Sequence, residues 1–446
     1  MKKLFSSTIL LFTALTPLFT DAQLGQPYEL NIQGVKVIVQ PSGNEIVEVL
    51  TIIKGGVQNY PAAKAGIEAL AMTALTECGT QKDDKNTFKN KLDKVSAQIN
   101  GFTGMDYASI RMNCIKSDLD VVWPLYVDAM TIPKFEPKEF DRIKQDAITN
   151  LKAAESNPDV AIRRMARQTA FNGRAYAKDP DGTVETVGKL TAAETKDYYN
   201  SIFNRGRMVI VVVGDIEKPV LEERLKSLLA KVPAGTPFTV KKESYLPAAN
   251  TLKPQPKELA TNYILGITGA PQPGTPDYDA FVLAMRIFQS KHFIEVRSNQ
   301  GLSYAPNVWF SDGLTPYTNI YVTTTEPNKY VAVARHLIDK IKKEGFTEED
   351  LKNQKTTYVT RVYYQQETAS AQAAALAQNE VINGNWKRAI TIKDDMKKVT
   401  AADLNRVFNK YINNITWAYQ GDPKKVNTVL YTQKETPTLP KEVKTF

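Results

Sequence analysis

Histidine is scarce in this chain, and its scarcity excludes most histidine chemistry. Only two of the 446 residues are histidines, His292 and His336. One copy of the chain therefore cannot build a zinc site with three histidine ligands, and a Ser-His-Asp triad would have to use one of these two side chains. Long apolar runs are also missing: no stretch after the N-terminus reaches about 18 apolar residues, so we expect no membrane span.

Cysteine is equally rare, and Cys78 and Cys114 are the only two thiols. Their spacing matches no metal-binding motif. In an oxidising compartment the two could form a disulfide that stabilises the fold by about 4 kcal/mol. Alternatively, both are small buried side chains, because Cys78 ends an apolar helix and Cys114 lies in an expected strand at 108–115. The residues alone leave both alternatives open.

The composition is that of a globular protein, with 42% hydrophobic and 24% charged residues. The length exceeds that of a common single domain, so two or more domains are expected. The formal net charge is +9, but the basic residues are scattered along the chain. Nucleic-acid binders usually concentrate such charge in a patch or stripe, so we expect no nucleic-acid partner.

The N-terminus has the pattern of a secretory signal peptide. Lys2 and Lys3 precede an apolar run at 9–19, and Thr20 and Ala22 occupy the small-residue positions of a cleavage site. We therefore predict a signal peptide at 1–22 and an exported protein, either periplasmic or secreted.

An internal repeat indicates that the mature chain is a duplicated unit. Three pairs of segments recur about 210 positions apart; they are 189–194 and 398–403, Gly214-Asp215 and Gly421-Asp422, and 135–140 and 346–351. The first pair opens a helix with a threonine cap in each copy. Five prolines in 233–257 mark the place where the copies join.

The predicted fold class is α+β, with two duplicated domains that each have a mainly antiparallel sheet and helices packed on one face. We predict domains at 23–235 and 259–446, joined by a linker at 236–258. Alternating apolar and polar residues predict strands at 28–39 and 46–53. Pro41-Ser42-Gly43-Asn44 between them is typical of a hairpin turn, so we expect these two strands to pair.

Ordered motifs along the chain resemble the insulinase/pitrilysin-type metallopeptidases, including mitochondrial processing peptidase subunits and bacterial two-subunit relatives. The motifs are Glu77-Cys-Gly79-Thr80, 204–215, Asp277-Tyr278 and Arg297-Ser-Asn-Gln-Gly-Leu-Ser-Tyr304. The last resembles the family's Arg-x3-Arg-Gly-Leu-x-Tyr segment, although Gln300 replaces the second basic residue.

The chain departs from the family at the zinc motif. Active members carry His-x-x-Glu-His on the helix after Gly66 and a third glutamate ligand further along the chain. Aligned from Gly66, the motif positions hold Ala69, Met72 and Thr73; aligned back from Gly79, they hold Leu70, Thr73 and Ala74. The third position falls near Asn150, and the closest acids are Asp146 and Glu155. We therefore expect this chain to bind no metal or other cofactor.

Arg297 and Tyr304 resemble the family residues that hold the scissile carbonyl and the substrate backbone opposite zinc. A phenol and a guanidinium suit this role, because both donate hydrogen bonds to an oxyanion. Alternatively, Arg297 satisfies carbonyls at a helix end and Tyr304 belongs to the core.

The resemblance implies a zinc-less subunit of a heterodimeric metallopeptidase, and the expected signal peptide implies that this subunit is exported. This chain would supply Arg297 and Tyr304 as substrate-binding residues and have no catalytic residues of its own. A paralogous partner subunit would supply zinc, and the substrate would be a peptide. The alternative is a non-catalytic peptide-binding or assembly scaffold with the same fold. Peptide cleavage by this chain alone is disfavoured because the zinc ligands are missing.

Overall fold

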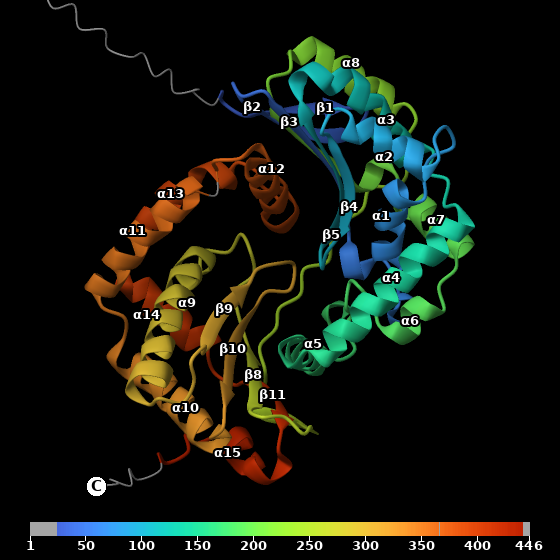
Figure 1. Cartoon of the computed structure of the whole chain (residues 1–446). Coiled ribbons are helices and arrows are strands. Elements are labelled where there is room, and N and C mark those ends of the chain that lie inside the picture. Colours follow the sequence, from blue (N-terminus) through green and yellow to red (C-terminus); the bar gives the residue numbers. More distant parts are fainter. Residues whose placement is uncertain (1–24, 365, 440–446) are drawn as a thin grey trace, which may run out of the picture.

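The computed structural model describes residues 25–364 and 366–439. The expected signal peptide at 1–22 lies outside these residues. Figure 1 shows two α+β halves, each with a twisted sheet and several helices on the outer face of that sheet. None of the helices in the described ranges is long and apolar enough to cross a membrane.

The N-terminal half contains six strands and eight α-helices. Its strands are β1 (Tyr28–Ile32), β2 (Val35–Pro41), β3 (Ile46–Lys54), β4 (Gln98–Thr103), β5 (Tyr107–Ile115) and β6 (Met208–Gly214). Its helices are α1 (Ile67–Glu77), α2 (Lys85–Asp93), α3 (Leu119–Thr131), α4 (Pro137–Ser156), α5 (Pro158–Ala170), α6 (Val184–Gly188), α7 (Ala192–Ile202) and α8 (Lys218–Leu229).

The C-terminal half contains five strands and seven α-helices within the described residues. Its strands are β7 (Thr251–Pro256), β8 (Asn262–Thr268), β9 (Asn307–Ser311), β10 (Tyr317–Thr324) and β11 (Thr416–Gly421). Its helices are α9 (Tyr278–Phe293), α10 (Pro327–Glu344), α11 (Glu348–Tyr364), α12 (Ala369–Gln378), α13 (Arg388–Lys398), α14 (Ala401–Tyr411) and α15 (Thr428–Thr432).

The two sheets have the same topology, which confirms the predicted duplication and the predicted fold class. The first sheet has the order β1-β2-β6-β3-β5-β4 and the second β7-β11-β8-β10-β9, so that only β1 lacks a counterpart. In both sheets one pair is parallel, β2 with β6 and β7 with β11, and the other pairs are antiparallel. The repeated segments form equivalent elements: Thr191 caps α7 and Thr400 caps α14, and each helix leads into a strand.

The predicted hairpin across Pro41–Asn44 is wrong. β2 and β3 do not pair, because β6 lies between them, parallel to β2 and antiparallel to β3. The first hairpin instead joins β1 to β2 through a turn at Gln33-Gly34. Every residue of β6 is buried, and a central position in the sheet suits such an apolar strand. The alternating patterns of β2 and β3 gave no sign that β6 would lie between them.

The two halves exchange helices across their inner sheet faces. Helix α5 of the N-terminal half packs on β8 and β11, and α12 of the C-terminal half packs on β3 and β6. Figure 1 shows both helices between the two sheets. The apolar residues of α12, among them Ala373 and Leu376, join a buried cluster with Val209, Val211 and Val213 of β6. Each sheet therefore has helices of its own half on one face and a helix of the other half on the opposite face.

The proline-rich segment predicted as linker contains a strand. β7 lies within the predicted range 236–258 and pairs in parallel with β11. It carries Pro254 and Pro256, which are compatible with a strand here because β7 is at the edge of its sheet, where a missing N–H leaves no neighbouring strand unpaired. The second domain therefore starts about eight residues earlier than predicted.

The two cysteines are free and buried in the structure. Cys78 follows α1, and Cys114 lies in β5. Burial raises the pKa of the Cys78 thiol to about 12 and that of Cys114 to about 11. Both thiols therefore stay protonated at neutral pH, and this arrangement favours the alternative in which they are small buried side chains.

Candidate functional site

The helix that carries the zinc motif in active relatives, α1, packs closely on the edge strand β4. Gly66 caps the helix with φ 92°, a conformation that favours glycine. Gly101 of β4 lies against the main chain of α1, where an added Cβ would come within 2.2 Å of the carbonyl oxygen of Met72. Two glycines therefore allow the close approach that positions α1 beside the sheet edge.

The positions of the missing zinc ligands meet in one cavity. Ala69 and Thr73, one helical turn apart on α1, and Asn150 on α4 all line a cavity of about 900 Å³. Met72 is fully buried and does not line the cavity. The alignment from Gly66 therefore places its three ligand positions around one cavity.

The alternative alignment fits the structure less well. It uses Leu70, which lines the same cavity, and Ala74, which is fully buried in the core. Of the two acids near Asn150, Asp146 lines the cavity and pairs with Arg142 at 3.0 Å. Glu155 lies outside this cavity and is 3.6 Å from Arg164. Within the described residues, neither acid belongs to a group of three or more possible metal ligands.

No group of three or more His, Cys, Asp or Glu side chains within 25–364 and 366–439 is arranged to hold a metal ion. His292 illustrates why one histidine does not make a site. It is fully buried on α9, its Nε2 lies 3.0 Å from the hydroxyl of Tyr330, and burial lowers its pKa to about 3. This side chain is a neutral part of the core.

The structure brings Arg297 and Tyr304 together at the end of α9. Residues 294–299 continue α9 as a π-helix, a variant that is frequent at functional sites. Nη1 of Arg297 donates a hydrogen bond to the main-chain carbonyl of Tyr304 over 3.1 Å. The guanidinium also lies 5.6 Å from the centre of the Tyr304 ring and 5.2 Å from that of Phe293. Arg297 is thus held between two aromatic rings.

Tyr304 is 86% exposed, which excludes the alternative that it belongs to the core. Its hydroxyl donates to no residue of the described chain, so this hydroxyl and the N–H groups of Arg297 other than that on Nη1 are available to a ligand. Both side chains line a shallow cavity of about 700 Å³ together with Phe293 and Ile294. The sequence analysis missed these two apolar neighbours, although an aromatic residue four positions before Arg297 was the signal for one of them.

The pair does not share a cavity with the zinc-ligand positions. No residue lines both the cavity beside α1 and the cavity around Arg297. The chain therefore presents two separate sites, one with the ligand positions of a lost metal centre and one with exposed hydrogen-bond donors.

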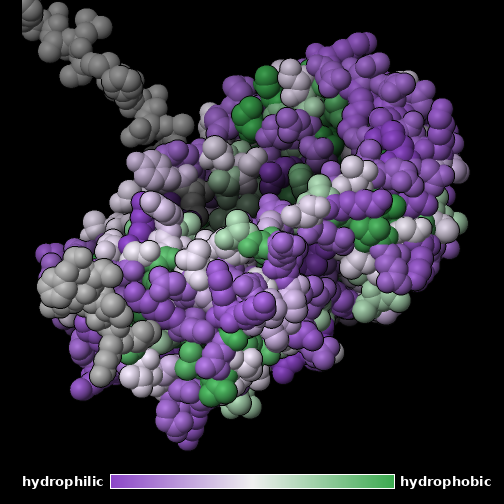
Figure 2. All heavy atoms as spheres, turned by 60° about the horizontal axis from the view of Figure 1, so that its bottom comes forward, coloured by the Kyte–Doolittle hydropathy of each residue, from purple (hydrophilic) through white to green (hydrophobic). Residues whose placement is uncertain are grey.

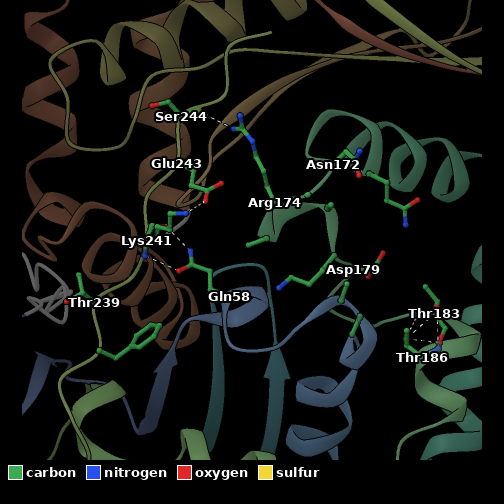
Figure 3. Close-up of a pocket in the computed structure, with 18 residues that line it drawn as sticks. Gln58, Asn172, Arg174, Asp179, Thr183, Thr186, Thr239, Lys241, Glu243 and Ser244 are labelled. Carbon is green, nitrogen blue, oxygen red and sulfur yellow. Dashed lines mark hydrogen bonds and ion pairs between the residues drawn. The ribbon is translucent and has the colours of Figure 1, made fainter. Parts of the chain in front are cut away.

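Another cavity, of about 1270 Å³, lies between the N-terminal half and the segment that leads to β7. Figure 3 shows Gln58 facing Lys241 and Arg174 reaching toward Ser244. Gln58 exchanges two hydrogen bonds with the main chain of Lys241, and Arg174 donates to the carbonyl of Ser244 over 3.0 Å. These groups hold the connecting segment in place.

Figure 2 shows that the surface in view is mostly hydrophilic, with hydrophobic residues in the hollow between the halves.

Comparison with known families identifies the class. Residues 36–180 match the model "Insulinase (Peptidase family M16)", and residues 189–358 match the model "Peptidase M16 inactive domain". The two matches together cover well over half of the chain, and the second begins within the N-terminal half, just before α7. The chain belongs to the insulinase family, peptidase family M16.

Individual relatives are distant but extend over most of the chain. One is "Uncharacterized zinc protease YmxG" of Bacillus subtilis, 20% identical over 335 residues, or 74% of this chain and 81% of that protein. Another is "Non-peptidase homolog YmxG" of Helicobacter pylori, 20% identical over 430 residues, or 93% of this chain and 99% of that protein. The crystal structure of a peptidase M16 inactive domain from Pseudomonas fluorescens matches with a TM-score of 0.81 and 17% identity, covering 89% of this chain and 98% of that one.

Proposed function

We propose that this chain is an exported, zinc-less subunit of a two-chain peptidase, which holds the peptide while a paralogous partner supplies the zinc. One observation carries the proposal. The chain keeps the fold and the cavity of the metal centre but has Ala69, Thr73 and Asn150 at the ligand positions, whereas Arg297 and Tyr304 form an exposed pair with free donors.

The names of the two relatives differ, and the residues of this chain decide between them. A zinc protease needs imidazole or carboxylate ligands, and alanine and threonine at adjacent turns of α1 provide none. The chain therefore has the character of the non-peptidase homolog at this site. Hydrolysis at a metal would then need a zinc ion from a second chain.

The Arg297 and Tyr304 pair suits a role in holding a peptide. The guanidinium of Arg297 lies between the rings of Phe293 and Tyr304 and donates a hydrogen bond to the Tyr304 carbonyl. These contacts hold the guanidinium in position before a ligand binds. Fixed donors lose little entropy on binding and stabilise charge that develops on a carbonyl oxygen. In the assembled pair, the phenol of Tyr304 would donate to this oxygen and Arg297 would hold the adjacent main chain.

The test is reconstitution with a zinc-bearing paralogue and measurement of peptide hydrolysis. Tyr304→Phe or Arg297→Ala should lower kcat/KM by about 100-fold or more, because removal of one donor to an oxyanion costs about 3 kcal/mol. Assembly and the partner's zinc content should not change. Tyr364→Phe, at another exposed tyrosine, on α11, is the matched control and should retain full activity.

Two results would contradict the proposal. Near-wild-type turnover in both variants would favour a non-catalytic peptide-binding or assembly scaffold, the function suggested by the full-length match to the non-peptidase homolog. Loss of assembly in either variant would make that residue structural.

A further inference from the structure

The cavity beside α1 has an apolar floor and a wall rich in arginine. Its floor includes Ala69 and Leu70 of α1 and Leu151 of α4. Arg163, Arg164 and Arg167, from a single helix, α5, line the wall. Loss of the metal ligands has therefore left a concave site of the size that binds small organic groups, with charged donors above an apolar surface.

The arginines of α5 have more donors than the neighbouring acids accept. Arg164 and Arg167 share one oxygen, Oδ2 of Asp179, at 3.0 and 2.9 Å. Nε of Arg167 is buried and has no hydrogen-bond partner in the described chain. This Nε is shielded from the cavity, so a ligand would reach Arg167 through Nη1, because Nη2 already pairs with Asp179.

Arg163 is the least engaged of the three. Within the two described ranges no carboxylate oxygen lies within 4.0 Å of its guanidinium, which lies 5.3 Å from the centre of the Trp309 ring. The side chain is exposed at the cavity. It is therefore an exposed cation whose donors have no acceptor in the described residues.

Most of the other charges that line the cavity are paired. Glu77 and Asp146 pair with Arg142 at 2.9 and 3.0 Å, and Asp179 pairs with Arg164 and Arg167. The fourth lining acid, Asp181, lies beside Asp179, and burial together with the charge of Asp179 raises its pKa. Within the described residues, Arg163 is therefore the one lining arginine without a carboxylate partner.

We propose that this cavity binds a peptide carboxylate, with the donors of Arg163 and Arg167 on the carboxylate oxygens and an adjacent apolar side chain of the peptide on the floor formed by α1 and α4. Guanidinium and carboxylate match in geometry and charge, and their hydrogen bonds are about twice as strong as neutral ones. That the ligand is a peptide rests on the proposed function; recognition of the carboxylate rests on the cavity alone.

The experiment measures binding of fluorescein-labelled hexapeptides to this chain without a partner, by fluorescence anisotropy. One peptide ends in leucine with a free carboxylate, a second is the same peptide with an amidated end, and a third is amidated but carries a glutamate beside the leucine. The free peptide should bind at least about 10-fold more tightly than the amidated one, as expected for loss of a charged hydrogen-bond pair. Comparison of the first and third peptides tells whether the carboxylate is a C-terminus or a side chain.

Three variants connect this binding to the cavity. Arg163→Gln should weaken binding of the carboxylate peptide about 10-fold and remove the preference over the amide, and Arg163→Lys should restore part of both. Thr73→Trp should block binding of all three peptides by filling the floor. Arg361→Gln, at an exposed arginine of α11 outside the cavity, is the control and should bind as the wild type does.

Equal binding of the carboxylate and amide peptides by the wild-type chain would overturn the proposal, and so would an Arg163→Gln variant that behaves like the control. Because no partner or hydrolysis is involved, these outcomes are independent of the test of Arg297 and Tyr304.

Discussion

The hydroxyl of Ser370 donates a hydrogen bond to Oε2 of Glu48 over 2.8 Å, although the two residues belong to different halves of the chain. Glu48 is fully buried on β3, and Ser370 lies on α12. The same carboxylate accepts from Asn113 at 2.8 Å and pairs with Arg111 at 2.9 Å. One buried charge therefore connects the first sheet to the helix that the second half contributes.

Removal of this charge should destabilise both halves together. Glu48→Ala should lower the free energy of unfolding by about 3–5 kcal/mol, because it leaves Arg111 without its ion-pair partner and two donors, from Asn113 and Ser370, without an acceptor. Ser370→Ala should cost only about 1 kcal/mol, because the carboxylate keeps its other partners. Urea unfolding followed by circular dichroism measures both. A Glu48→Ala variant as stable as the wild type would show that this contact does not hold the halves together.

The lost metal centre should be restorable at the positions that share the cavity. The purified chain should contain no stoichiometric zinc, because Ala69, Thr73 and Asn150 provide no metal ligand of the kind that zinc prefers. Ala69→His, Thr73→His and Asn150→Glu together should give about one zinc per chain by elemental analysis.

The other alignment provides the matched control for the zinc experiment. Leu70→His, Ala74→His and Asn150→Glu together should bind no zinc and should destabilise the fold, because Leu70 and Ala74 are buried. Zinc binding by the control but not by the first triple variant would show that the alignment from Gly66 is wrong.

Asp106 should make stability depend on pH. Burial raises its pKa to about 6 despite hydrogen bonds from the Tyr176 hydroxyl at 2.5 Å and from the main-chain N–H of Leu314 at 3.3 Å. A folded-state pKa above the unfolded value means that the folded chain binds the proton more tightly. The stabilisation is therefore complete below about pH 4 and is lost as pH rises through about 6, by about 2–3 kcal/mol in total.

Urea midpoints measured between pH 4 and pH 7.5 test this expectation. Asp106→Asn cannot titrate but keeps an acceptor oxygen, so it should lose this contribution to the pH dependence. Asp146→Asn, at an exposed acid, should retain it. Identical pH profiles for the wild type and Asp106→Asn would show that Asp106 does not titrate in this range.

Much of the architecture could be predicted from the sequence because the duplication is visible as short sequence motifs that recur in both halves. The threonine caps of α7 and α14 and the strands that follow them recur at a fixed offset, and each motif depends on a few adjacent residues. The family resemblance and the absence of zinc ligands likewise depend only on residue identity. A side chain without a nitrogen, oxygen or sulfur ligand of the right kind binds no zinc in any fold.

The sequence by itself thus determined the class of fold, its duplication and the loss of the metal ligands. Only the tertiary structure decided that β6 separates β2 from β3, that α5 and α12 cross to the other half, and that Arg163 and Arg167 lie above the emptied site. The physical reason is the distance along the chain over which each interaction acts. Capping, residue identity and periodicity act over a few residues, whereas strand order and cavity lining depend on contacts between residues that are far apart in the chain, and no local pattern encodes them.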